Sequence, residues 1–198
     1  MSIKPILFST SMVKEILAGR KTQTRRVIVP PLWSTGTQAD FAEEEDGTIS
    51  TICENTGCFS AILPRYRKGD ILWVRETFFE HKGMYYYKAD GKHKPLDKLI
   101  GGSFFKWWPS IHMPKAAARI FLHVTDVRVE RVQDINCDDA MDEGITLDFD
   151  GDCYESDYMD KFHELWDSIN AKRGYGWEEN PWVWVYTFER CEKPTEWP

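Results

Sequence analysis

The order of the expected elements constrains this 198-residue chain more than any other feature of its sequence. A short apolar segment at about 3–8 precedes a helix at about 10–18. Several β-rich segments follow, then two helices and a closing strand at about 182–190. Because strands and helices do not alternate throughout, a doubly wound parallel sheet is disfavoured. We therefore expect an α+β fold, a small mixed β-barrel with helices packed across its openings.

The expected domain organisation is one domain with two insertions. The length suits a single domain with decorated loops, and 42% hydrophobic residues can build a sizeable core. Residues 32–62 are polar and include an acidic run at 43–46, so we interpret them as an insertion. The irregular stretch at about 88–112 is a second one. We predict a single domain over 1–198 that carries both.

The cysteines and the apolar segments bear on location and cofactors. No apolar run reaches the length of a membrane span, and the N-terminal segment does not resemble a secretion signal. Five irregularly spaced cysteines then indicate reduced thiols in a cytoplasm. Cys53 and Cys58 lie close together, but no second close Cys or His pair completes a zinc pattern. We expect no disulfide, no metal and no organic cofactor.

The net charge limits the kind of nucleic-acid partner. The chain carries −7 at pH 7, with a sequence pI of about 5.3. Proteins that bind long nucleic acids are usually basic, because cations replace the counterions of the phosphates. A nucleic-acid role here therefore needs a local patch of positive charge, or a ligand as small as a nucleoside.

Residues 19–26, GRKTQTRR, concentrate positive charge just after the first expected helix. One interpretation is a solvated charge run, which also suits the dipole at a helix C-terminus. The other is a polar pocket in which Lys21 and Thr24 meet. Residues three apart share a side in a tight turn but not in a strand, and Gly19 supplies a sharp exit from the helix. We expect a tight turn through 19–26 rather than a strand.

That turn would give the lysine and the threonine a chemical use. Neighbouring arginines would lower the pKa of Lys21. A neutral lysine beside the Thr24 hydroxyl is a workable base and nucleophile pair. Two further segments carry candidate residues. Arg75 and Glu76 follow a buried-looking run, as either an edge-strand ion pair or part of a pocket, and Glu143 comes late in a short acidic helix.

Taken together, these motifs resemble the ASCH domain, a β-barrel of the PUA-like class. The G-x-K-x-x-x-x-R pattern stands at Gly19, Lys21 and Arg26 and is followed by KGDILWVRETF. Later come VTDVRVER, an A-x-x-E-G helix and a closing W-V-W-V-x-x-F strand. The amino-acid sequence is most similar to that of the phage- and prophage-encoded branch of this family. The resemblance covers most of the chain and leaves the two insertions as elaborations.

The resemblance implies several functions for such a fold. Members are described as RNA binders and transcription coactivators; one bacterial branch hydrolyses acetylated cytidine nucleosides, and another cleaves RNA. Carried over from the hydrolase branch, Lys21 is the base and Thr24 the nucleophile. Glu143 orients the lysine or carries the proton.

We therefore expect a protein that binds RNA or a modified nucleoside, with hydrolysis of an acyl amide on a pyrimidine such as acetylcytidine as the candidate reaction. The expected walls of the ligand pocket are Arg26, Arg75, Glu76 and Arg119. Two alternatives stay open. One is a non-catalytic module that binds RNA or DNA, and the other is a phage accessory protein that binds a host protein. No membrane role is expected.

Overall fold

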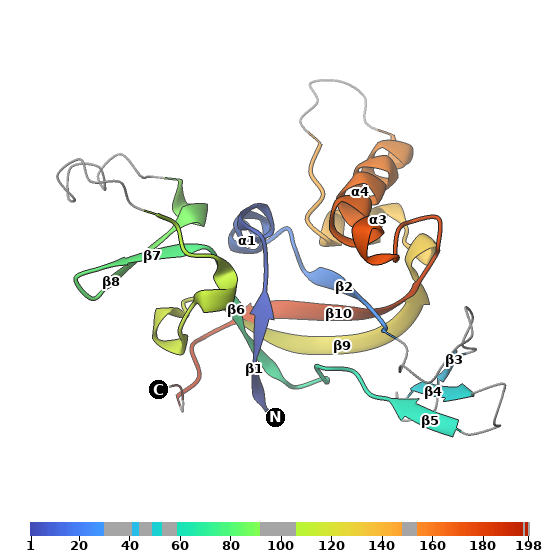
Figure 1. Cartoon of the computed structure of the whole chain (residues 1–198), viewed down its shortest axis with the longest axis horizontal. Coiled ribbons are helices and arrows are strands. Elements are labelled where there is room, and N and C mark those ends of the chain that lie inside the picture. Colours follow the sequence, from blue (N-terminus) through green and yellow to red (C-terminus); the bar gives the residue numbers. More distant parts are fainter. Residues whose placement is uncertain are drawn as a thin grey trace. The chain divides into compact units, whose positions relative to one another are not determined.

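Figure 1 shows a computed structural model of the chain, which describes residues 1–29, 41–43, 49–52, 59–91, 106–147, 154–195 and 197. The chain divides into two compact units, each assembled from separated stretches. The first unit comprises residues 1–22, 69–124 and 188–198, and the second comprises residues 23–68 and 125–187. In the part that the structure describes, every helix is too short or too polar to cross a membrane.

A mixed five-stranded sheet has the order β1-β6-β9-β10-β2. β1 pairs parallel with β6, whereas β6 with β9 and β10 with β2 are antiparallel. β9 and β10 contribute residues to both units. The bounds are β1 Ile3–Leu7, β2 Gln23–Val27, β6 Ile71–Arg75, β9 Phe121–Arg131 and β10 Trp182–Cys191. The α+β class predicted from the sequence is confirmed.

The closed barrel predicted from the sequence is wrong for the described strands. β1 and β2 stand at opposite ends of the sheet order and do not pair with each other. A closed barrel needs a partner on both sides of every strand. Pro5, within β1, has no backbone N–H to donate to a second neighbour, which suits an edge strand. The sheet is therefore open.

Three α-helices and five short 3-10 helices are described. Their bounds are α1 Thr10–Leu17, α3 Cys137–Asp142 and α4 Glu155–Asn170, with η1 Lys88–Asp90, η2 Ser110–His112, η3 Lys115–Ala117, η4 Val132–Asp134 and η5 Ala171–Arg173. The Ser9 hydroxyl caps α1 by accepting from the Met12 N–H, and Val13 and Ile16 are its buried residues. The expected first helix is confirmed within one residue.

In the second unit, α3 and α4 lie side by side (Figure 1) and pack on β10. Their shared core contains Ala140, Phe162, Trp166, Val183 and Val185. Phe162 and Trp166 belong to the apolar stripe of α4, at the i, i+4 spacing that places two side chains on one face. This packing positions α3 beside β2, where the candidate residues lie.

Two smaller sheets lie outside the five-stranded sheet. β3 (Phe41–Glu43), β4 (Ile49–Ile52) and β5 (Phe59–Ile62) pair with one another, and β7 (Phe78–His81) forms a hairpin with β8 (Met84–Tyr87). The strands within 32–62 thus contribute nothing to the five-stranded sheet, as expected of an insertion. The single domain over 1–198 and the exact insertion bounds stay predictions.

The tight turn expected through 19–26 is wrong beyond Thr22. Gly19 has a φ of 77°, and the N–H groups of Arg20 and Lys21 both donate to the Glu15 carbonyl, so the chain does leave α1 sharply. β2 then begins at Gln23. Pairing with β10 satisfies its backbone and outweighs the local turn signal.

In the first unit, the Asp70 side chain, just before β6, holds the N-terminal end of β1 by hydrogen bonds. Its carboxylate accepts hydrogen bonds from the Ser2 backbone N–H at 2.9 Å, the Ser2 hydroxyl at 2.7 Å and Lys4 Nζ at 2.7 Å. Asp70 itself is buried. Losing this acceptor leaves three donors to find other partners.

We predict that Asp70→Ala lowers the free energy of unfolding by about 1–3 kcal/mol, because buried hydrogen bonds to a charged group are lost. Chemical denaturation of the full chain measures this change. The matched control is Asp126→Ala, which removes an exposed carboxylate and is expected to stay within about 0.5 kcal/mol of the parent. Equal midpoints for Asp70→Ala and the parent would refute the fastening role.

Candidate functional site

The two faces of β2 carry different candidate residues. Successive strand residues project to opposite faces, so Gln23 and Arg25 share one face while Thr24 and Arg26 share the other. Gln23 Nε2 donates to Asp142 Oδ2 of α3 at 3.1 Å, which identifies the first face as the one toward α3. The side chains on the two faces of β2 therefore lie in different environments within the second unit.

On the face toward α3, Arg25 is surrounded by three carboxylates. Its side chain is 1% exposed. Nη2 donates to Asp139 Oδ2 at 2.9 Å and to Glu130 Oε2 at 3.1 Å, and Nη1 donates to Glu143 Oε1 at 3.4 Å. The guanidinium also lies 5.9 Å from the centre of the Phe162 ring. We call this set, with Gln23 and Arg128, the Arg25 network.

Arg128 supplies the second cation of the network. It donates to Glu130, to Asp139 Oδ1 at 3.0 Å and to Gln23 Oε1 at 3.3 Å. Burial alone would lower the pKa of Arg128, but the bonds and charges of Glu130 and Asp139 outweigh burial and raise it. Asp139 is therefore clamped between two guanidinium groups, whereas Glu143 has the longest of the Arg25 bonds.

The end of α3 places Glu143. Its backbone N–H donates to the Asp139 carbonyl at 2.9 Å, and the N–H of the following Gly144 donates to the Met141 carbonyl at 2.8 Å. Gly144 has a φ of 85°, which glycine adopts without strain at a helix C-terminus. Glu143 is 5% exposed, so its carboxylate is withdrawn from solvent.

The opposite face of β2 carries Thr24 and Arg26. In the register with β10, Thr24 lies opposite Tyr186 and Arg26 lies opposite Trp184, and opposed residues project to the same side. The Tyr66 ring meets the Tyr186 ring edge-on at 5.1 Å between centroids. We call these five residues the Thr24 face. Arg26 is half-buried, and the other four are buried.

The charge of Arg26 is affected by its surroundings in the same unit. Burial lowers the pKa of Arg26, while Tyr66, Glu143 and Tyr186 act in the opposite direction. Arg26 therefore lies within the electrostatic reach of Glu143. Together with the Arg25 network, three guanidinium groups balance the carboxylates of Glu130, Asp139 and Glu143.

The two tyrosines of the Thr24 face are strongly held in their neutral form. Burial raises the pKa of Tyr186 to about 12, although the backbone groups of Tyr66 and Arg65 act against this rise. Burial also raises the pKa of Tyr66, with the charges of Arg65 and Arg26 opposing it. Near neutral pH the Thr24 face therefore offers three hydroxyl groups, each a donor and an acceptor, and one guanidinium.

The four cations of residues 19–26 have different environments. Arg20 is exposed and pairs with Glu15 at 2.5 Å, as a solvated charge run predicts. Lys21 is only 2% exposed, and its Nζ lies 5.7 Å from the centre of the Phe8 ring in the first unit. Arg25 is buried and Arg26 half-buried in the second unit. The solvated interpretation thus holds for Arg20 alone.

In the first unit, Glu76 pairs with Arg119 rather than with its neighbour Arg75. Glu76 is almost wholly buried and accepts from Arg119 Nε at 2.8 Å and Nη2 at 3.0 Å. Arg119 also pairs with Asp90 at 2.8 Å, and its guanidinium lies 3.8 Å from the centre of the Tyr87 ring. Arg119 thus contacts the other three side chains, those of Glu76, Asp90 and Tyr87. A ligand role for Glu76 or Arg119 stays a prediction.

The pKa values in this cluster follow from burial and pairing. Burial raises the pKa of Glu76, although Arg119 acts against the rise. For Arg119, burial alone would lower the pKa, but hydrogen bonds to Glu76 and Asp90 outweigh burial and raise the pKa.

Arg75 has other partners than Glu76 and Arg119. It donates to the Ile111 carbonyl, and its guanidinium is 5.5 Å from the centre of the Trp73 ring.

The structure thus brings together some predicted site residues within a unit and not others. Thr24, Arg26 and Glu143 belong to the second unit, while Lys21, Arg75, Glu76 and Arg119 belong to the first. The sequence analysis missed Arg128, Glu130 and Asp139 of the Arg25 network. The available signal was the opposite charge of the acidic DDAMDE segment (138–143) and the basic KTQTRR run (21–26).

The described ranges contain no group of three or more His, Cys, Asp or Glu residues that could hold a metal ion. Cys137 and Cys191 are free thiols, and Cys53, Cys58 and Cys153 lie outside the described residues. The expected absence of a disulfide, a metal and a cofactor stays a prediction.

Comparison with known proteins gives one structural likeness. No known family model and no curated protein sequence matches the chain. The chain is similar to a crystal structure of an ASCH domain from Lactobacillus crispatus JV V101, with 13% identity and a TM-score of 0.42. The likeness covers 96% of this chain and 79% of that one. A TM-score below 0.5 does not establish a shared fold, so membership of the ASCH family stays a prediction.

We predict that Arg25→Met lowers the free energy of unfolding by about 3–5 kcal/mol, because three carboxylates lose their shared buried partner. Denaturant unfolding followed by tryptophan fluorescence measures the loss. Arg25→Lys should recover only part of it, since an ammonium cannot reproduce the planar fork. Lys172→Met, at an exposed cation, is the control. A parent-like midpoint for Arg25→Met would show that the network does not support the second unit.

A second prediction concerns alkaline pH. Because folding raises the pKa of Tyr186 to about 12, the folded state holds its phenolic proton more tightly than the unfolded chain. This stabilisation is complete below the ordinary phenol pKa and is lost as the pH rises toward 12. We expect Tyr186→Phe to weaken the fall in stability between about pH 10 and 12. Tyr154→Phe, at an exposed phenol, should leave the fall as in the parent.

Proposed function

We propose that this chain is an ASCH-domain protein that binds RNA or a modified nucleoside through the Thr24 face. The observation that carries the proposal is the composition of that face. A half-buried guanidinium and three hydroxyl groups are gathered with aromatic rings, within reach of the Glu143 charge. The ligand that matches such a set is planar, polar and rich in both donors and acceptors.

A nucleobase has these properties. Its carbonyl and ring nitrogen atoms accept hydrogen bonds, which Arg26 can donate in pairs. Its exocyclic amino group donates, and the hydroxyl of Thr24, Tyr66 or Tyr186 can accept from it. Aromatic side chains such as Tyr66 and Trp184 suit stacking on an unpaired base. A nucleoside-sized ligand also agrees with the acidic charge of the chain, since few phosphates need to be neutralised.

The candidate reaction is hydrolysis of an acyl amide on a pyrimidine nucleoside, with the roles implied by the resemblance. Thr24 Oγ attacks the acyl carbon and gives its proton to Lys21. The C–N bond then breaks, and the ring amine leaves with that proton. Water hydrolyses the acyl-threonine to a free acid and restores the hydroxyl. These roles rest on the resemblance alone, since Lys21 belongs to the first unit and Thr24 to the second.

The test combines binding and turnover. Purified protein is screened against acetylcytidine, other acylated nucleosides and unmodified nucleosides, with binding followed by calorimetry and turnover by mass. We predict that Arg26→Met weakens binding at least tenfold, because a charge-assisted hydrogen-bond donor is lost. Thr24→Val and Lys21→Ala should abolish turnover. Thr24→Ser should retain part of it, since the hydroxyl remains.

The controls separate the competing functions. Thr195→Val, at an exposed threonine, should behave as the parent, and circular dichroism confirms that each variant stays folded. Binding without turnover in the parent would leave the non-catalytic module. Absence of nucleoside and RNA binding, together with a complex formed with a host protein, would favour the accessory protein and overturn the proposal.

A further inference from the structure

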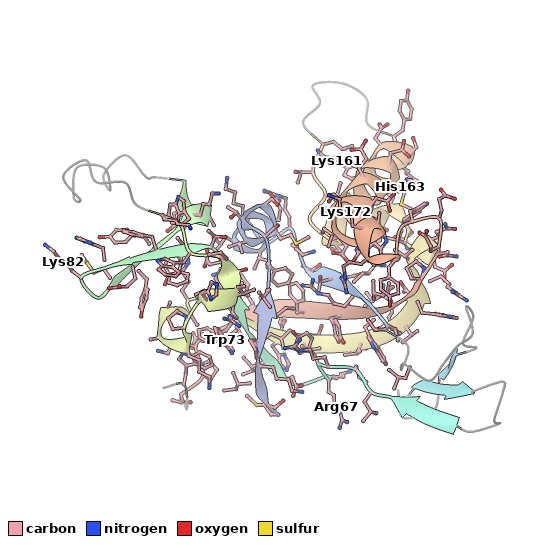
Figure 2. All side chains as sticks on the ribbon, in the orientation of Figure 1. Arg67, Trp73, Lys82, Lys161, His163 and Lys172 are labelled. Atoms are coloured by element: carbon pink, nitrogen blue, oxygen red, sulfur yellow. The ribbon has the colours of Figure 1, made fainter. Side chains whose placement is uncertain are left out.

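Trp73 and Arg75 of β6 carry buried N–H groups that have no acceptor. Residues two apart in a strand project to the same face, so both side chains lie on one face of the five-stranded sheet, where Figure 2 labels Trp73. Within the part of the chain that the structure describes, Trp73 Nε1 and Arg75 Nε are buried and have no hydrogen-bond partner. Because buried donors in proteins are nearly always paired, two unpaired donors on neighbouring side chains favour an acceptor that is not part of the chain.

Both side chains are held in place by their neighbours in the first unit. Arg75 Cζ lies 5.5 Å from the centre of the Trp73 ring, and Arg75 Nη2 donates to the Ile111 carbonyl. The Trp73 ring meets the Trp197 ring edge-on at 5.5 Å between centroids, and both belong to one apolar cluster with Phe121. Trp73 is 5% exposed, whereas Arg75 is half-buried. The Arg75 end of this pair is therefore the one that solvent reaches.

The charge of Arg75 favours an anion over a water molecule. Arg20, Arg25, Arg119 and Arg128 each pair with a carboxylate, whereas Arg75 forms no ion pair with any described residue. Withdrawing a guanidinium from water without a counter-charge costs free energy, which a bound anion offsets. The first unit as a whole also attracts anions, because 15 Lys and Arg against 9 Asp and Glu give it +6, whereas 10 against 23 give the second unit −13.

The number of charges and of donors narrows the kind of anion. One guanidinium balances one negative charge, so a phosphate dianion would leave a charge uncompensated beside the apolar cluster of Trp73, Phe121 and Trp197. A carboxylate is a monoanion, and each of its two oxygens accepts hydrogen bonds, which suits two separate N–H donors. Chloride matches the charge but offers a single centre. A carboxylate is therefore the best match.

We propose that Trp73 and Arg75 form a binding site for a small carboxylate. Trp73 Nε1 and Arg75 Nε donate to the carboxylate, and the guanidinium supplies the counter-charge. The carboxylate belongs either to a free organic acid or to the carboxyl end of a peptide, and the experiment distinguishes the two. The site concerns the first unit alone and does not rest on the function proposed for the Thr24 face.

The experiment follows the indole N–H signals of the nitrogen-15-labelled full chain by NMR during a titration with acetate at constant ionic strength. The Trp73 signal is assigned by its loss in Trp73→Phe. We expect a saturable downfield shift of this signal in the parent, because its N–H gains an acceptor. Arg75→Met should weaken acetate binding about tenfold, since a charged donor is lost. Arg75→Lys should recover part of the affinity, because the charge remains but the Nε donor does not.

The matched control is Arg131→Met, which removes a half-buried arginine whose Cζ lies 4.2 Å from the centre of the Trp182 ring in the second unit. It should bind acetate as the parent does, and circular dichroism checks that each variant is folded. Thr24→Val should also bind acetate normally, so this proposal and the Thr24 proposal fail separately.

Further ligands decide between the possible occupants. Tighter binding of N-acetylglycine than of acetate identifies a peptide carboxyl end as the ligand, and the reverse order identifies a free acid; both support the site. An equal shift with chloride would leave an adventitious ion only, and tighter binding of phosphate would contradict the carboxylate. No shift of the Trp73 signal with acetate, or a parent-like shift in Arg75→Met, would overturn the proposal whatever the stability of the variants.

Discussion

Burial of the Arg25 guanidinium among three carboxylates is the interaction on which the second unit depends. Removing a charge from water costs several kcal/mol, and only close partners with good geometry offset that cost. Here the partners come from β9 and from α3, so one side chain joins three elements. Arg25 Nε has no hydrogen-bond partner within the described residues, so the cost is not fully offset.

The contacts of Arg25 determine where the candidate residues of the second unit lie. Thr24 and Arg26 flank Arg25 on β2, so fixing Arg25 toward α3 directs both neighbours to the opposite face. Glu143 is fixed from the other side by the end of α3 and by its long bond to Arg25. Asp139 and Glu130 accept from Arg25 at shorter distances than Glu143 does.

Local structure could be predicted from the sequence, and pairing between distant segments could not. The Ser9 cap and the Gly19 stop are local signals, and they located α1 within a residue. The strand at 23–27 depends on pairing with 183–187, about 160 residues away, which no local pattern reveals. The open edge at β1 is equally a matter of long-range topology. For the site, residue types singled out Lys21, Thr24 and Glu143, whereas the partners of Arg25 lie 105 to 118 residues away in sequence.

The opposite charges of the two units have a consequence for how the isoelectric point of this chain is understood. At an ionic strength of 0.1 M the Debye length is about 10 Å, which is less than the radius of gyration of about 13 Å for a unit of this size. A charged surface therefore responds to local charge and not to the sum over the chain, and the first unit carries 15 Lys and Arg against 9 Asp and Glu while the second carries 10 against 23. Above its isoelectric point of about 5.3, the protein is formally an anion. It should nevertheless adhere to a cation exchanger, because its first unit carries a formal charge of +6.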